Sequence, residues 1–143
     1  MDLFIYNNFK EQVMEGVFNL ATGGDTLKAT LHTGYTPDID THTVWADVSA
    51  TEYGTAGGYT AGGKTLANQD VTQDDTNNLG KFDADNLTWA GTLLSPTTPS
   101  HLILWDDTPA GDPLICYFVL GTTATTGGSY VLNFGTDGII ALT

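Results

Sequence analysis

Side chains alternate between polar and apolar along Thr26-Leu27-Lys28-Ala29-Thr30-Leu31-His32-Thr33. Successive side chains of a strand point to opposite faces, so Leu27, Ala29 and Leu31 share one buried face of a predicted strand. Further strand-like runs follow this one at short spacing. They cover residues 64–73, 80–84, 86–89, 101–106, 114–120, 129–134 and 139–142.

Clusters rich in Gly, Pro, Asp and Asn separate these runs, at residues 74–78, 95–99, 108–113, 127–128 and 136–138. Several short strands joined by such turns are typical of a sandwich or barrel. A chain of 143 residues without an internal repeat fits one domain. We therefore predict a mainly β protein: a single antiparallel β-sandwich domain over residues 1–143, jelly-roll-like, with one N-terminal α-helix.

That helix is predicted over residues 8–20, where apolar residues recur at steps of three and four. Asn8 is the expected N-cap, and Glu11 stands where a capping box has its acid. Gly23-Gly24 is the expected stop. A short apolar patch at residues 44–48 fits one further helical turn. The apolar residues on the helix face are Phe9, Val13, Met14, Val17 and Phe18.

The charge balance is strongly acidic, with four lysines, no arginine and 17 Asp and Glu, giving a formal charge of -13. A protein needs a basic surface to bind a nucleic acid or an anionic membrane. The charge balance therefore excludes both as partners. We expect no signal peptide and no transmembrane segment, because the apolar run at the N-terminus is short. The single cysteine, Cys116, lies in an apolar run and is interpreted as core.

One motif invites an enzymatic interpretation, because Gly58-Tyr59-Thr60-Ala61-Gly62-Gly63-Lys64-Thr65 matches the phosphate-loop pattern GxxxxGK[ST]. A phosphate loop follows a buried strand and precedes a helix whose N-terminus faces the phosphates. Residues 51–57 do not read as a buried strand, and residues 66–73 alternate like a strand. We interpret the motif as a glycine-rich hairpin loop and keep an NTPase acting through Lys64 as the enzyme alternative.

Other chemistry is weakly indicated. Acidic pairs such as Asp74 with Asp75 suggest either calcium or solvated turns that bind their own backbone. The histidines stand far apart along the chain, without zinc spacing. Tryptophans at 45, 89 and 105 fit either core or sugar stacking. The sequence therefore assigns no catalytic residue, no cofactor and no metal ligand.

Several motifs in combination resemble a family of small virion proteins of tailed bacteriophages. They occur at residues 35–42, 58–66, 74–77, 82–85 and 88–89, together with the opening segment 8–10 and the closing segment 138–140. The resemblance covers nearly the whole chain and implies a structural role in the particle, as head decoration or as a minor tail component. Relatives carry Arg and Lys in the strand that corresponds to residues 101–107, where this chain has neither.

The resemblance implies that the chain is made in the bacterial cytoplasm and carried on the outer surface of the virion. The first hypothesis is a capsid decoration (cement) protein that binds the major capsid protein and, by analogy, forms trimers. The alternative is a tail, neck or adhesion component, with glycan contact through tryptophans. As partner-interface candidates we name apolar residues of the long polar stretch, with a small core beneath that loop as the competing interpretation: Tyr35, Ile39, Trp45 and Tyr59.

Overall fold

The computed structural model describes residues 1–90, 99–121 and 129–143. Within them, ten strands form three antiparallel sheets, as the mainly β prediction requires. The largest sheet has the order β1-β8-β7-β2-β3. Its strands are β1 (Asp2–Ile5), β8 (Leu114–Val119), β7 (His101–Asp106), β2 (Leu27–His32) and β3 (Lys64–Thr65).

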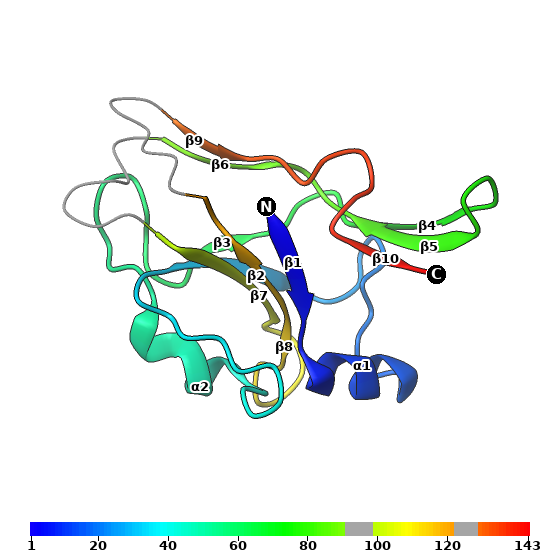
Figure 1. Cartoon of the computed structure of the whole chain (residues 1–143), viewed down its shortest axis with the longest axis horizontal. Helices are drawn as coiled ribbons and strands as arrows, with labels where there is room; N and C mark the ends of the chain where they lie inside the picture. The colour runs from blue at the N-terminus through cyan, green and yellow to red at the C-terminus, as the bar shows by residue number, and fades with distance from the viewer. Residues whose placement is uncertain (91–98, 122–128) are drawn as a thin grey trace.

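Two smaller sheets complete the β structure (Figure 1). One has the order β10-β5-β4, and its β4–β5 hairpin projects from the body of the molecule. The other is a two-stranded ribbon, β6-β9. Their strands are β4 (Asp70–Asp74), β5 (Leu79–Asp83), β6 (Leu87–Trp89), β9 (Tyr130–Leu132) and β10 (Ile140–Leu142). The predicted turn at 127–128 and residues 95–98 of the predicted turn at 95–99 lie outside the described residues.

The central strands of the large sheet, β2, β7 and β8, are buried on both faces. Leu27, Ala29 and Leu31 lie in the main core, on the predicted face of β2. On the opposite face of β2, Thr30 and His32 have no exposed surface either, and Lys28 is half-buried. A second core lies on their side of the sheet, under the long loop and α2 (Trp45–Val48), which is followed by a 3₁₀ turn at Ser49–Thr51. The expected helical turn near residue 45 is present. It helps to cover the second core, which explains why Thr30 and His32 on that face of β2 are shielded from solvent.

The N-terminal helix is shorter than predicted. Helix α1 spans Asn7–Met14, with Tyr6 at its N-cap and no side-chain cap, so Asn8 does not cap it. Gly16 has φ +76° and ends the helix seven residues before the expected stop at Gly23. The Val17 N–H donates to Gln12 O at 3.0 Å and the Gly16 N–H to Val13 O at 3.3 Å, which are the two bonds of a Schellman motif.

The apolar N-terminus belongs to the chain's own sheet. Strand β1 pairs antiparallel with β8, with Leu3 opposite Phe118 and Ile5 opposite Cys116. Phe4 is 42% exposed on the outer side and stacks on Tyr117, with ring centroids 5.0 Å apart.

The predicted strand over residues 64–73 is interrupted. It forms β3 in the large sheet and β4 in the small one. Between them Asn68 has φ +53°, a conformation that Asn tolerates better than most residues and that breaks a strand. The other predicted strands agree with the observed ones to within a few residues at each end. Among the described residues no helix is long and apolar enough to span a membrane.

Candidate interaction surface

An apolar groove of about 320 Å³ lies between the helix region and the small sheet of β4, β5 and β10. One wall comes from α1 and the segment that follows it, and the other from the face of the small sheet. The wall from the helix region consists of Phe9, Val13, Phe18, Asn19, Leu20 and Ala21. The wall from the sheet consists of Val71, Gly80, Lys81, Phe82, Ile140 and Leu142.

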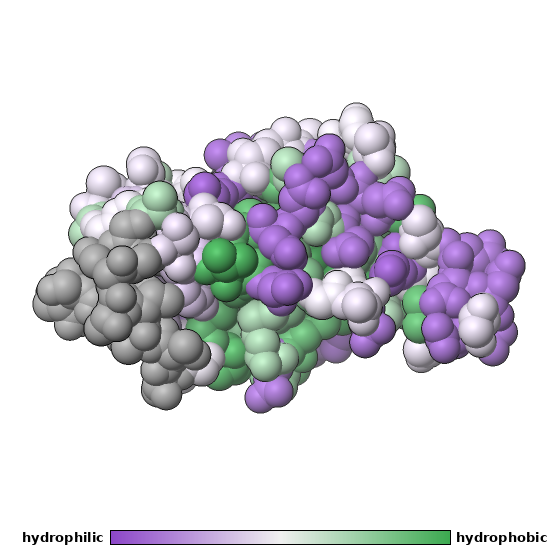
Figure 2. All heavy atoms as spheres, turned by 90° about the horizontal axis from the view of Figure 1, so that it is seen from above, coloured by the Kyte–Doolittle hydropathy of each residue, from purple (hydrophilic) through white to green (hydrophobic). Residues whose placement is uncertain are grey.

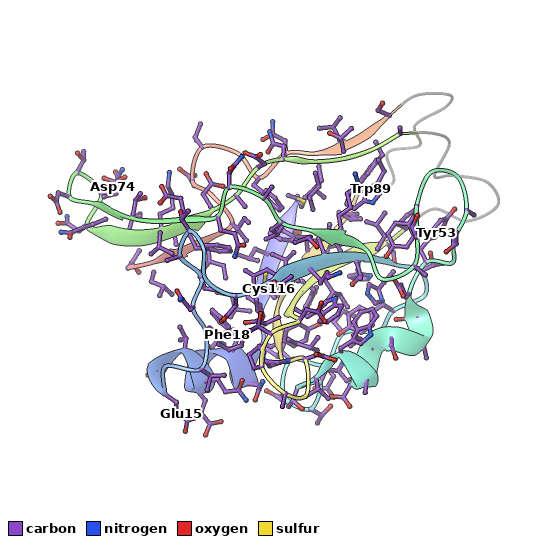
Figure 3. The ribbon with its side chains drawn as sticks, turned by 180° about the vertical axis from the view of Figure 1, so that it is seen from behind. Glu15, Phe18, Tyr53, Asp74, Trp89 and Cys116 are labelled. Carbon is purple, nitrogen blue, oxygen red and sulfur yellow. The ribbon has the colours of Figure 1, made fainter. Side chains whose placement is uncertain are left out.

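The early helix stop builds the first wall. Because the chain reverses at Gly16, Phe18 packs on Phe9 with ring centroids 4.8 Å apart. The segment after Phe18 is then tied to the strand side, where the Thr22 hydroxyl donates to Gln69 O at 2.5 Å and the Gln69 amide donates to Asp25 O at 3.2 Å. Figure 3 shows Phe18 between α1 and the sheets, with Glu15 pointing away from them.

The second wall is the face of a three-stranded sheet with side chains in rows. Phe82 of β5 lies opposite Val71 on one side and Ile140 on the other. In the next row on that face, Gly80 lies opposite Gln73 and Leu142. A Cβ placed on Gly80 would meet nothing within 4 Å, so the floor of the groove is open there.

The groove leaves apolar side chains in water. Val71 is 51% exposed and Leu142 is 56% exposed. The hairpin that carries Val71 is acidic, with aspartates at 70, 74, 75 and 83 against the single cation Lys81. Lys81 Nζ donates to Thr136 O at 3.1 Å. Figure 2 shows hydrophilic residues covering the end of this hairpin, so the groove is an apolar surface beside a negative one.

The four proposed interface residues do not form this surface. Tyr35 is 6% exposed and Tyr59 is 2% exposed, so the expectation that they stand exposed in a loop is wrong. Ile39 and Trp45 are half-buried and pack with Tyr35 against the second core. Tyr59 belongs to the main core. For Tyr35, Ile39 and Trp45 the structure has the small core beneath the long loop, which was the competing interpretation.

The three histidines, distant in the sequence, meet around Tyr35. Ring centroids of His32, His42 and His101 lie 5.8, 5.6 and 5.3 Å from that of Tyr35. His32 and His101 are directly opposite in the β2–β7 pair, a register that the sequence alone did not reveal. The Tyr35 hydroxyl bonds to that of Tyr6 at 2.7 Å and to His42 Nδ1 at 2.9 Å.

His32 is held in its neutral form. The Thr51 hydroxyl donates its one hydrogen to Val48 O at 2.9 Å. The oxygen of that hydroxyl therefore accepts the Nδ1–H of His32 at 3.0 Å. The Thr30 hydroxyl, 2.9 Å from Nε2, can then donate to it. Burial, and next to it the neighbouring His101, lowers the pKa of His32 to about 3. Burial also lowers the pKa of His101.

The glycine-rich motif is a loop followed by a strand, as predicted. Lys64 and Thr65 form β3, which pairs with β2, where a phosphate loop has a helix. The Glu52 side chain binds donors of the loop. Its Oε1 accepts hydrogen bonds from the Gly62 N–H and the Tyr59 hydroxyl, both at 2.6 Å. A carboxylate of the chain itself thus takes donors that a phosphate would need.

Two aspartates bind the backbone of their own turns, as the solvated-turn interpretation expects. Asp74 Oδ1 accepts the N–H groups of Thr76 and Asn77, both at 3.0 Å. The Asn77 side chain and backbone lower the pKa of Asp74. Asp38 similarly accepts the N–H groups of Asp40 and Thr41. Across the described residues no group of three or more His, Cys, Asp or Glu is placed to hold a metal.

Asp106 is the exception among the acids, because it is fully buried. Its Oδ1 accepts the Thr108 N–H at 3.0 Å. Burial raises the pKa of Asp106 to about 7, and the Asp25 carboxylate beside it acts in the same direction. Asp106 is sealed inside the fold, so it is a structural group.

The remaining candidates are core residues. Cys116 has no exposed surface, and burial raises the pKa of its thiol, so it is not a reactive cysteine. Trp89 is 1% exposed and Trp105 is 5% exposed, which leaves neither ring free to stack on a sugar. Trp45 stacks on Trp105 with centroids 4.8 Å apart. Figure 3 shows Cys116 in the interior and Trp89 beneath the two-stranded ribbon.

No family model, curated protein or solved structure matches the chain.

Proposed function

We propose that the chain is a structural protein of a tailed-bacteriophage particle that docks on the outside of the head shell as a decoration protein. It acts by binding and carries out no reaction. The observation that carries the proposal is the open apolar groove, with Val71 and Leu142 half-exposed at its rim, in an otherwise strongly acidic chain. Exposed apolar surface of this kind typically marks a site of protein interaction.

The charge supports the outer side of a particle. A formal charge of -13 is repelled by packaged DNA, so a position outside the shell costs less than one inside it. The resemblance of residues 35–42, 58–66 and 74–77 to small virion proteins supplies the biological setting. The jelly-roll-like sandwich and the trimer that go with decoration proteins remain parts of this proposal.

Stripped heads test the proposal. Purified chain is mixed with heads of its phage from which the outer proteins have been removed, and the heads are then sedimented. A decoration protein sediments with them in a saturable amount, because its sites on the shell are finite. Chain that stays in the supernatant, or that binds only purified tails, contradicts the head position, and binding to tails would favour the tail or neck alternative.

A further inference from the structure

Strand β4 has a free edge. It is the terminal strand of the sheet β10-β5-β4, and its outer side pairs with no other strand of the described residues. Residues 70–73 are exposed and Asp74 is half-buried. An exposed edge of this length presents unpaired N–H and C=O groups that can pair with another chain.

The charges along that edge disfavour a second copy. If two β4 strands paired antiparallel about Thr72, Asp70 of each would lie opposite Asp74 of the other. Like charges opposite one another destabilise a sheet. Asp70 already lies opposite Asp83 within the hairpin, so this face has one repulsive pair before any partner arrives. A cationic side chain beside Asp70 would relieve that repulsion.

The two faces of β4 would favour different side chains in a strand that pairs with it. Val71 lines the groove, and Gln73 lies on the same face because side chains alternate along a strand. Asp70, Thr72 and Asp74 lie on the opposite face. In an antiparallel pair, residues directly opposite share a face. A strand added to β4 would therefore point two side chains toward the groove side and three toward the acidic side.

We infer that the outer edge of β4 binds, by strand addition, an extended segment of another protein with the order basic, apolar, any residue, apolar, basic. The two basic side chains pair with Asp74 and Asp70. Of the two apolar side chains, one lies opposite Val71 and the other opposite Gln73, on the face that lines the groove. Backbone hydrogen bonds provide the attachment, and the side chains select the sequence. The inference rests on the proposed function in one respect: the segment belongs to the particle protein on which the chain docks.

A designed peptide tests the inference without any virion. The probe is a peptide with blocked ends and the centre Lys-Leu-Thr-Val-Lys, titrated into the full chain by calorimetry and by amide NMR. The matched probe has Glu in place of both Lys. We expect the Lys peptide to bind with amide shifts along β4, and the Glu peptide to bind about tenfold more weakly, since two attractions become two repulsions.

Chain variants separate groove contact from charge and folding. Val71→Asp should weaken binding of the Lys peptide about tenfold by removing the apolar contact. Val131→Asp is the matched control. Val131 is 55% exposed, and it lies in the middle of β9, which belongs to a different sheet from β4. All variants are checked for folding by thermal melting.

Four results would overturn the inference: no binding of the Lys peptide, equal binding of the two peptides, equal effects of Val71→Asp and Val131→Asp, or a dimer of the chain that Val71→Asp dissociates. The stripped-head assay separates the two proposals. If heads take up the Val71→Asp variant to the same extent as the unchanged chain, the decoration role stands, but the β4 edge has no part in it. Peptide binding by a chain that no head takes up supports the edge and contradicts the decoration role.

Discussion

His32 shows how a titratable residue can be accommodated in a dry interior. Both ring nitrogens have hydroxyl partners, at Thr30 and Thr51, and the side chain has no exposed surface. Burial removes the water that would stabilise a charged ring, and His101 acts in the same direction, so the pKa of His32 falls to about 3. The cost of this arrangement should appear in the pH dependence of stability.

We predict that His32 makes the fold less stable in acid. The unfolded chain binds a proton at His32 below a pKa of about 6.5, whereas the folded chain does not until about pH 3. The stability is therefore complete above pH 6.5 and falls as the pH is lowered through this window. Between pH 7 and pH 5 the loss is about 2 kcal/mol.

Urea unfolding of His32→Gln beside the unchanged chain measures this effect. The variant should lose stability at pH 7, since a packed ring is removed, but its stability should depend less on pH between 7 and 5. Asp106 has a raised pKa and contributes the opposite slope in both proteins, so the comparison cancels it. Equal slopes for the two proteins would show that His32 is not buried in the neutral form.

At the scale of elements, the glycines of the 58–65 motif have structural reasons of their own. Gly62 has φ +93° and open space where a Cβ would stand. Gly63 has φ +68°, and a Cβ there would lie 2.2 Å from Ala29 O of strand β2. The second glycine lets the loop pass against the sheet before β3 begins. Close packing of backbone on backbone thus explains Gly63, the glycine that precedes Lys64 in the motif resembling a phosphate loop.

We predict unequal costs for two substitutions in this motif. Gly62→Ala should destabilise the fold by about 1 to 2 kcal/mol, because only the positive φ is strained. Gly63→Ala should cost more, about 3 kcal/mol or above, since the backbone of β2 must also move. Denaturant unfolding gives both values, and Gly54→Ala, at an ordinary φ with open space, is the neutral control. Equal costs at 62 and 63 would contradict the close approach to Ala29.

Elements with a strong local pattern could be predicted from the sequence, and those set by long-range pairing could not. Strand β7 was predicted to the residue, because a continuous apolar run between turn signals has few alternatives. The helix was overextended past Gly16, since Val17 and Phe18 continue the apolar spacing even though the chain has already turned. Phe18 contacts Phe9 after that reversal, so the spacing was right about the contact and wrong about the helix.

The groove and the histidine cluster could not be predicted from the sequence, because both depend on the pairing of strands that are distant along the chain. His32 meets His101 only through the register of β2 with β7. Val71 meets Phe82 and Ile140 only when β4, β5 and β10 form one sheet. Neither contact has a local signal. The interface candidates lie in the long loop at 34–63, but that loop covers the second core, whereas the half-exposed Val71 and Leu142 at the groove lie on the small sheet.

At the scale of the whole molecule, the charge and the apolar surface are arranged in a complementary way. The large sheet and its two cores form the stable body, and the acidic β4–β5 hairpin projects from it (Figure 1). Self-association at β4 is opposed by Asp70 and Asp74, whereas a cationic, apolar strand is attracted. This arrangement of charge and apolar surface fits the proposed role, in which the chain attaches to a large particle.

The most direct test of the account is a cryo-EM map of heads saturated with the chain. The account predicts density for the chain on the outer surface of the shell, with the free edge of β4 against an extended segment of a shell protein. It also predicts side-chain density from that segment beside Val71. A map that places the chain on the tail, or on the head with β4 facing solvent, would contradict the account.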